Sequence, residues 1–152
     1  MNRRDALKTA LFASIGVMAG CRSDRASDQA LMEEIADTLL PTTAGSPGAK
    51  AAGTGAAMSL ILNDCYTPAQ QRGVREGLDR FRAKNFLAQS RTDREAFVRS
   101  VGREAWFAPV RDLALGAYFS SETGMTKALR YVRIPGKYVG CMPLEPGQPA
   151  WG

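Results

Sequence analysis

The stretch FAPVRDLALGAYF, residues 107–119, decides the fold. Its apolar residues lie around much of the circumference of a helix. A helix that is apolar on nearly every side belongs in the interior of a protein rather than on its surface. The sequence therefore predicts a central helix here, with the other elements packed around it.

Two amphipathic segments lie in the first half of the chain. Residues 27–40 place their leucines and isoleucine on one helical face, with Ser27 in the position of an N-cap. Residues 56–65 show the same spacing and place Cys65 on the buried face. Residues 41–55, between them, are rich in Gly, Pro and small side chains, which predicts a long ordered loop.

Capping motifs mark the next two helices. Thr67 and Gln70 have the spacing of a capping box and predict a helix that runs to about Gln89. Its basic residues are expected to face solvent, and anion binding is the alternative. Thr92 and Glu95 have the same spacing and predict a shorter helix.

After the central helix, Ser121 is expected to cap a last helix, which would extend to Val132. From Ile134 onward the chain holds four prolines and no helical period. Neither a repeat nor a convincing strand is visible. We therefore expect an all-α fold, a small bundle of about five to six helices with a Pro/Gly-rich coil tail at the C-terminus.

The first twenty-one residues have the features of an export signal. Arg3 and Arg4 precede an apolar run, as in the twin-arginine signals that export folded proteins, and an ordinary secretory signal is the alternative. The run ends in Met18-Ala19-Gly20-Cys21, a candidate lipobox in which Cys21 would be acylated. Simple cleavage nearby, or retention of the segment, would leave Cys21 unmodified. We expect residues 1–21 to be the signal and residues 22–152 to form a single helical domain.

Composition excludes most kinds of catalytic site. The chain has no histidine, which removes the usual general base, the commonest metal ligand and the usual haem ligand. Its formal charge of +5 includes the basic residues of the signal, and the others alternate with acids, so no nucleic-acid partner is expected. Asp64, Glu76 and Glu122 are expected to be solvated charges, and Ser121 a cap rather than a nucleophile. We expect no catalytic, cofactor-binding or metal-binding residues in this chain.

Cys65 and Cys141 remain as an even pair in an oxidising compartment. A disulfide between them would join the coil tail to the bundle. Two free buried thiols, or an intermolecular bond to a partner subunit, are the alternatives.

Aromatic residues on predicted coil are candidate anchors for a protein partner. Tyr131, Tyr138 and Trp151 lie in or beside the tail, and Trp106 and Phe107 precede the central helix. The alternative is that they pack onto the bundle.

Several fragments together carry a family resemblance. They are IADTLLPTT at 35–43, PGAKAAG at 47–53, LNDCY at 62–66, YFSSETGM at 118–125 and YVRIPGKYVGC at 131–141. In this order and spacing, the chain resembles the gluconate 2-dehydrogenase subunit 3 family, the small subunit of membrane-bound sugar and sugar-acid dehydrogenases.

The resemblance implies an accessory role. In such complexes a large flavoprotein carries FAD and oxidises the substrate, and a cytochrome c subunit with haem passes the electrons on. The small subunit would help the flavoprotein to fold and to leave the cytoplasm. The expected location is the periplasm, in association with the inner membrane through a partner or a lipid. The main alternative is a free-standing periplasmic lipoprotein with a protein-binding role, and a third is an enzyme in its own right.

Overall fold

The computed structural model describes residues 27–151 except 135 and 138. The predicted signal, with Arg3, Arg4 and Cys21, lies outside these residues, as does Tyr138. Helices form the described part, with only isolated β-bridges beside them. They are a first helix at residues 27–39, α2 (Thr54–Asp64), α3 (Pro68–Ala83), the 3₁₀ turn η1 (Phe86–Ala88), α4 (Arg91–Val101), α5 (Ala108–Phe119) and the π-helical turn η2 (Gly124–Ala128). The predicted all-α fold is confirmed.

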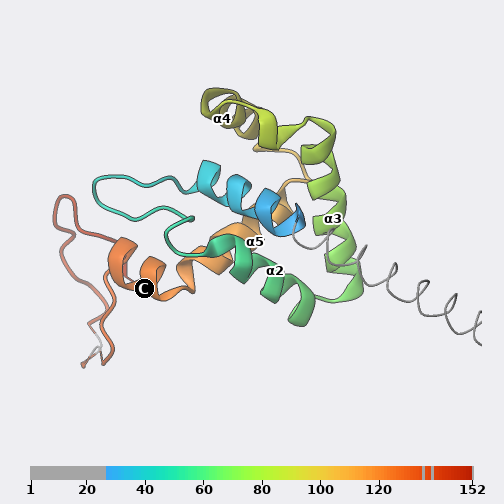
Figure 1. The fold of residues 1–152 in the computed structure, drawn as a ribbon. Coiled ribbons are helices and arrows are strands. Elements are labelled where there is room, and N and C mark those ends of the chain that lie inside the picture. Colours follow the sequence, from blue (N-terminus) through green and yellow to red (C-terminus); the bar gives the residue numbers. More distant parts are fainter. Residues whose placement is uncertain (1–26, 135, 138, 152) are drawn as a thin grey trace, which may run out of the picture.

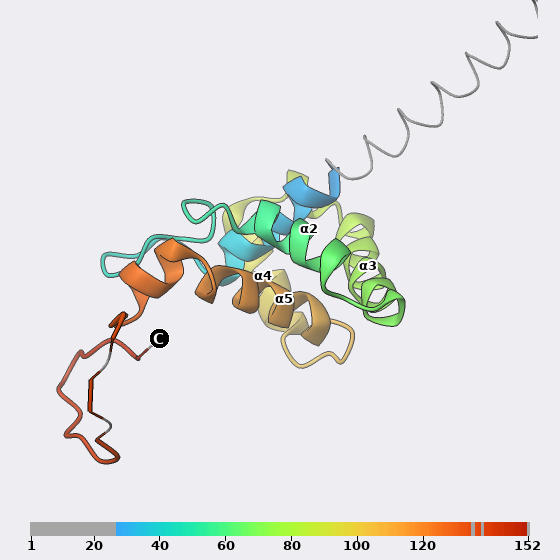
Figure 2. The same ribbon diagram turned by 90° about the horizontal axis from the view of Figure 1, so that it is seen from below.

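Helix α5 is the central element of the bundle, as predicted. It packs against α2, α3 and η2 (Figures 1 and 2). The side chains of α5 that are removed from solvent are Val110, Leu113, Ala114, Ala117 and Tyr118. The first helix adds Leu31, Met32, Ile35 and Ala36 to the same core.

An aromatic cluster fills the core between α3, η1 and α4. Phe81 lies at its centre, with its ring centroid 4.9 Å from that of Phe86 and 5.4 Å from that of Phe97. Trp106 and Phe107 complete it, at 5.8 and 5.9 Å from Phe81. These two residues therefore pack onto the bundle, which is the alternative to a role as partner anchors.

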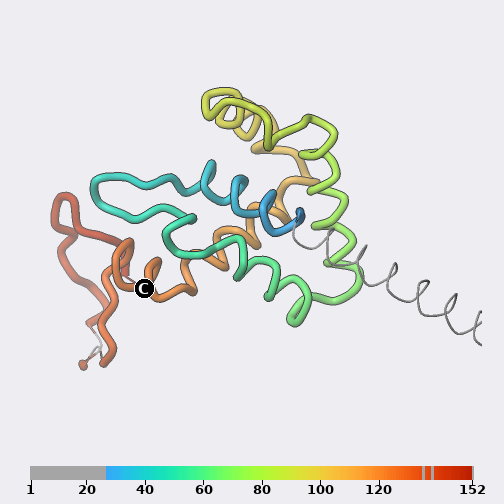
Figure 3. Tube along the Cα trace, in the orientation of Figure 1, coloured from blue at the N-terminus to red at the C-terminus, as the bar shows by residue number. Residues whose placement is uncertain are grey.

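The loop after the first helix is ordered, as predicted. Residues 41–53 leave the first helix, turn and return to α2 (Figure 3). Ala49 is fully buried, and its N–H donates to the carbonyl of Leu40 at 2.8 Å. The hydroxyl of Tyr118 donates to the carbonyl of Pro47, which ties the loop to the end of α5.

The capping box of α3 is confirmed, but the predicted end of this helix is wrong. The hydroxyl of Thr67 accepts from the N–H of Gln70, whose side chain accepts in return. The helix ends at Ala83 rather than near Gln89, because Asn85 takes a left-handed conformation with φ 51°. This turn places Phe86 in the core against Phe81.

Helix α4 begins before the predicted cap. Ser90, not Thr92, is its N-cap, and the Ser90 hydroxyl accepts from the N–H of Asp93 at 3.2 Å. The predicted cap at Ser27 is also wrong, because Ser27 is itself helical. Sequence alone did not separate the two candidates at α4, because Ser90 and Thr92 are both residue types that cap helices.

The last helix is shorter than predicted. It ends at Ala128, and Val132, expected on its inner face, is 40% exposed. Its last turn is π-helical. Gly124 lies against the end of α5, where a Cβ would clash with the carbonyl oxygen of Tyr118. Residues 129–151 contain no helix where they are described, in agreement with the predicted coil tail.

Candidate functional site

The predicted disulfide is absent from the structure. Cys65 and Cys141 are both free, and both are exposed. Cys65 was expected on the buried face of α2, but the helix ends at Asp64 and Cys65 is its exposed C-cap. It lies where α2 turns into α3, whereas the tail leaves the opposite end of the body (Figures 1 and 2). The structure therefore holds both thiols unpaired.

The C-terminal loop, defined here as residues 130–151, is closed at its base. The N–H of Arg130 donates to the carbonyl of Ala150 at 2.7 Å, and the Arg130 guanidinium lies 4.2 Å from the centre of the Trp151 ring. Of the predicted partner contacts, Tyr131 is 48% and Trp151 47% exposed. Trp151 lies at the base of the loop against Arg130, and Tyr131 is the next residue along the chain from Arg130.

The same loop exposes aliphatic residues that the sequence analysis did not single out. Ile134 is 81% exposed and Leu144 82%, and both lie between the two ends of the base. Val139 and Met142 are each more than half exposed. The signal was present in the sequence, because apolar residues in a segment with four prolines have no helix or sheet to bury them.

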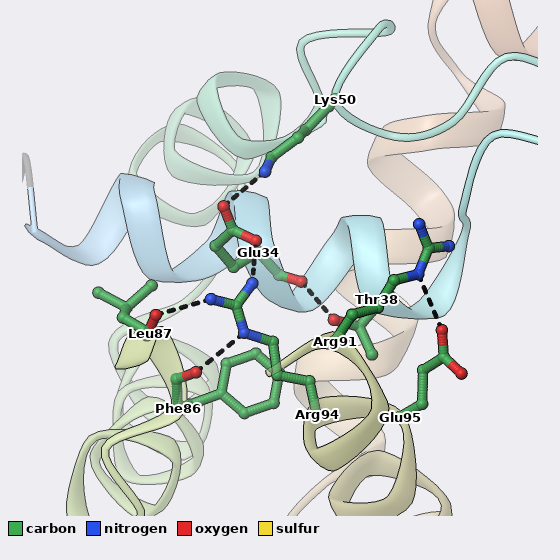
Figure 4. Close-up of polar contacts among 8 residues, drawn as sticks. All are labelled: Glu34, Thr38, Lys50, Phe86, Leu87, Arg91, Arg94 and Glu95. Carbon is green, nitrogen blue, oxygen red and sulfur yellow. Dashed lines mark hydrogen bonds and ion pairs between the residues drawn. The ribbon is translucent and has the colours of Figure 1, made fainter. Parts of the chain in front are cut away.

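A polar cluster joins three elements on another side of the molecule (Figure 4). Glu34, on the first helix, forms an ion pair with Lys50 of the following loop and another with Arg94 of α4. The guanidinium of Arg94 also donates to the carbonyls of Phe86, at 3.0 Å, and Leu87, at 2.6 Å. Arg94 is thus the point where the first helix, η1 and α4 meet.

The charges of this cluster offset one another. Burial raises the pKa of Glu34, but the hydrogen bonds and charges of Lys50 and Arg94 outweigh it and hold this pKa below its ordinary value. The hydrogen bond to Glu34 in turn raises the pKa of Lys50. A carboxylate held ionised between two cations is a poor proton acceptor, so the cluster is suited to joining helices rather than to acid–base chemistry.

A second ion cluster lies at the start of the first helix. Asp28 pairs with Arg82 and, at 3.7 Å, with Arg75. Arg82 also pairs with Asp79, at 2.5 Å. Two carboxylates thus accompany the two guanidinium groups that line this open hollow, which argues against the anion-binding alternative for the basic residues of α3.

The remaining candidates for chemistry are not assembled into a site. Asp64, Glu76 and Glu122 are exposed, as expected of solvated charges. The hydroxyl of Ser121 accepts from the N–H of Gly124 at 3.0 Å, which is a structural contact. Within the described residues, no group of three or more acidic or cysteine side chains is placed to hold a metal ion. Nor does any described helix have the length and apolar character needed to cross a bilayer.

Comparison with known protein families identifies a match that covers the helical body. The family model described as gluconate 2-dehydrogenase subunit 3 matches residues 26–136. The chain belongs to the gluconate 2-dehydrogenase subunit 3 family. Membership implies the small subunit of a dehydrogenase complex, in partnership with the other dehydrogenase subunits. No curated protein and no solved structure matches the chain.

The region matched by the gluconate 2-dehydrogenase subunit 3 family includes every described helix. It ends at residue 136, inside the C-terminal loop. Val139, Met142, Leu144 and Trp151 therefore lie beyond the matched region. The family match thus covers the helical body and the first residues of the C-terminal loop.

Proposed function

We propose that the chain is the non-catalytic small subunit of a periplasmic, membrane-associated, FAD-dependent dehydrogenase that acts on gluconate or a related sugar. It binds the flavoprotein subunit, supports its folding and carries the twin-arginine signal that exports both chains. The single observation that carries this proposal is the family match over residues 26–136.

The arrangement of polar groups supports a non-catalytic role. Glu34, Lys50 and Arg94 form a partly buried polar cluster, and their charges join three elements of the fold. The chain has no histidine that could supply a general base near neutral pH. FAD and haem c belong, in this proposal, to the flavoprotein and the cytochrome c subunit.

The positions of the two ends of the body support joint export. Residues 27 and 28 begin the first helix at one end of the body, and the C-terminal loop leaves the other end (Figures 1 and 2). A partner bound at the loop leaves the start of the first helix uncovered. The signal at Arg3 and Arg4 then serves a folded complex, which is the cargo that the twin-arginine route accepts.

Export of the partner tests this function directly. The chain and a candidate flavoprotein subunit from the same organism are expressed together, either unchanged or with Arg3→Lys and Arg4→Lys in this chain. We expect yellow flavoprotein to copurify with the tagged chain from the periplasm, and the double variant to leave the flavoprotein in the cytoplasm. Recovery of the chain as a monomer without flavin, with the flavoprotein exported in its absence, would overturn the proposal in favour of a free-standing protein.

The route to the membrane is tested by a second variant. Cys21→Ser removes the only thiol of the candidate lipobox. If the complex stays with the membrane fraction, the partner subunits hold it there, and if it becomes soluble, an acyl chain on Cys21 contributes. A single acyl chain gives only weak binding, so we expect the partner to contribute most of the retention.

A further inference from the structure

Helix α2 is apolar on its outer face as well as on the face that it buries. Its inner face places Met58 and Leu62 in the core. On the outer face, Leu60 is 63% exposed, and Ala56, one turn before it, is also exposed. No charged residue occurs in this helix before Asp64. A surface helix normally carries charged or polar residues on its outer side, so this face departs from the usual pattern.

The helical repeat places these outer residues on one surface. Ala56, Leu60 and Asp64 follow one another at intervals of four, so they form a single row along the helix. Ala57 and Ile61, both partly exposed, lie beside this row. Helix α2 runs along the lower edge of the helical body in Figure 1, and no other helix passes in front of it in Figure 2. The small side chains at the start of the row allow another helix to approach closely.

The two ends of α2 carry the opposite of the charges that a helix favours. A helix is stabilised by an acidic group at its start and by a basic group in its last turn. The start of α2 has no side-chain cap at Gly53 and no acidic residue in its first turn. Its last turn has no basic residue and ends in the exposed Asp64. An acidic group is therefore missing at one end of the helix and present at the other.

An antiparallel copy of α2 corrects both ends at once. Two α2 helices that meet antiparallel through their outer faces place Leu60 against Leu60 of the second copy, and residues equally far before and after Leu60 then face each other. Ala56 therefore faces Asp64 of the second copy, whose carboxylate lies beside the uncapped first turn. Because Leu60 is close to the middle of Thr54–Asp64, the two helices overlap along most of their length of about 16 Å.

We infer that the outer face of α2 is a self-association surface, through which two copies of the chain pair as an antiparallel, two-fold symmetric dimer centred on Leu60. Two-fold symmetry makes each contact between Asp64 and the first turn occur twice. The face is small in comparison with the interfaces of permanent dimers, so the association is reversible, with a dissociation constant of about 10 µM to 1 mM. This inference is independent of the proposed function, which does not require a pair of small subunits.

The contribution of Leu60 is tested by sedimentation velocity over a series of concentrations. The tagged chain is purified in the form in which its host processes it, and we expect its mass to rise from monomer to dimer as the concentration rises. Leu60→Ser should raise the dissociation constant about tenfold or more, because each dimer loses two leucine side chains from its centre. Leu87→Ser is the matched control, since Leu87 is 46% exposed but lies on η1. A chain that stays monomeric up to about 1 mM would overturn the inference.

Cross-linking tests the position of the symmetry axis. Leu60→Cys should give a disulfide-linked dimer under mild oxidation, because position 60 meets its own counterpart, whereas Leu87→Cys should not. Both variants keep the native cysteines. Cys65 lies five residues beyond the axis, so its counterpart is about 15 Å away along the helices and the unchanged chain should not cross-link there. No cross-link through position 60 would overturn the antiparallel arrangement.

The charges at the two ends test the register. Asp64→Lys places an ammonium group beside the positive start of the other helix, and Ala56→Asp places two carboxylates side by side, so each should weaken the dimer several-fold. Both changes favour α2 within a single chain, so a loss of stability cannot explain the weakening. Together they should restore the dimer, because the new carboxylate then faces the new ammonium group. Additive weakening in the double variant would contradict this register.

The flavoprotein subunit is the other occupant to which this face could belong, and the outcomes separate the two. If the chain is monomeric and Leu60→Ser reduces copurification with the flavoprotein, the face binds that subunit: self-association is overturned, and the proposed function stands. If the chain forms the dimer but binds no flavoprotein, the inference stands and the proposed function falls.

Discussion

Arg94 is the residue on which the junction of the first helix, η1 and α4 depends. It pairs with Glu34 and donates to two backbone carbonyls, and its side chain is only 17% exposed. Its partner on the first helix is sixty positions away in the sequence. No local pattern marks such a contact, so the sequence shows Arg94 only as one charge among many.

We expect Arg94→Ala to lower the free energy of unfolding by about 2 kcal/mol, because it leaves a partly buried carboxylate and two carbonyls without their donor. Urea denaturation followed by circular dichroism measures this. Arg91→Ala is the matched control: Arg91 pairs with Glu95 one turn along the same helix, but its side chain is 70% exposed (Figure 4). Its loss should cost less than about 0.5 kcal/mol. If the two variants lost equal free energy of unfolding, the contacts of Arg94 would be worth no more than those of an exposed surface ion pair.

Glu34 predicts a pH dependence of stability. Burial raises its pKa, but Lys50 and Arg94 more than offset this, so the pKa in the folded chain lies below the ordinary 4.5. A lowered pKa gives stability that is present above pH 4.5 and is lost as the pH falls through the folded value. We expect Glu34→Gln to lower stability at neutral pH and to flatten its decline below about pH 4.5. Unfolding measured at a series of pH values from neutral to acid checks this, and an unchanged slope would contradict it.

At the scale of the elements, α3 and α5 approach each other closely because Gly77 has no side chain. A Cβ at this position would lie 2.5 Å from Cγ2 of Val110. The same Cβ would lie 3.4 Å from the carbonyl oxygen of Trp106, so backbone as well as a side chain crowds this position. The sequence analysis did not single out this glycine, and the reason for it appears only in the structure.

We expect Gly77→Ala to lower the free energy of unfolding by about 1–3 kcal/mol, although alanine is the better helix former, because it overpacks the contact with Val110. Gly73→Ala, one turn earlier on α3, is the matched control, since a methyl group there would have no other atom within 4 Å beyond its own helix. There the same change should stabilise by about 0.5–1 kcal/mol. Adding Val110→Ala to Gly77→Ala should recover part of the loss, and a double-mutant cycle measures this coupling. If Gly77→Ala and Gly73→Ala both stabilised the protein, α3 and α5 could not be as close at Gly77 as the structure shows.

The elements also show which boundaries can be predicted from sequence. Periodicity identified α5 and the inward faces of the first helix and α3, because burial against neighbours follows the helical repeat. The start of α3 was also predictable, because its cap is a local motif. The end of α3 was not, because the left-handed turn at Asn85 is fixed by the distant packing of Phe86 on Phe81 and Phe97. Nor did any local motif mark the π-helical turn in which the last helix ends.

The candidate partner-contact residues were predicted only in part, again because tertiary packing decides which of them are exposed. Aromatic residues on coil were recognised, but whether each one faces a partner or its own chain depends on tertiary structure. Trp106 and Phe107 pack into the body, and Trp151 stacks on Arg130. The exposed positions of Ile134 and Leu144 follow from the path of the loop, which has no repeat from which to predict them.

At the scale of the whole molecule, the core and the C-terminal loop are separate. The buried hydrophobic residues of the described chain lie between Leu31 and Tyr118, so the described part of the loop adds none. We expect a chain that stops after Leu129 to keep its helical content and to unfold within about 1 kcal/mol of the full chain, because no core contact is removed. Thermal unfolding by circular dichroism measures this. A large loss of stability would mean that the loop stabilises the bundle. The predicted Cys65–Cys141 disulfide would have had that effect, but the two cysteines are free.

The closed base of the loop has a practical consequence. Arg130 and Trp151 lie side by side with the chain running in the same direction at both, so the segment 130–151 can be made as a synthetic macrocycle if a short linker turns the chain from Trp151 back to Arg130. Such a peptide would present the exposed aliphatic residues of the loop without the helical body. Competition of this peptide with the full chain would show whether the loop takes part in binding the flavoprotein, and its linear counterpart, which must lose more entropy to bind, should then compete less well. Fluorescence anisotropy with a labelled macrocycle would give the affinity of the isolated contact.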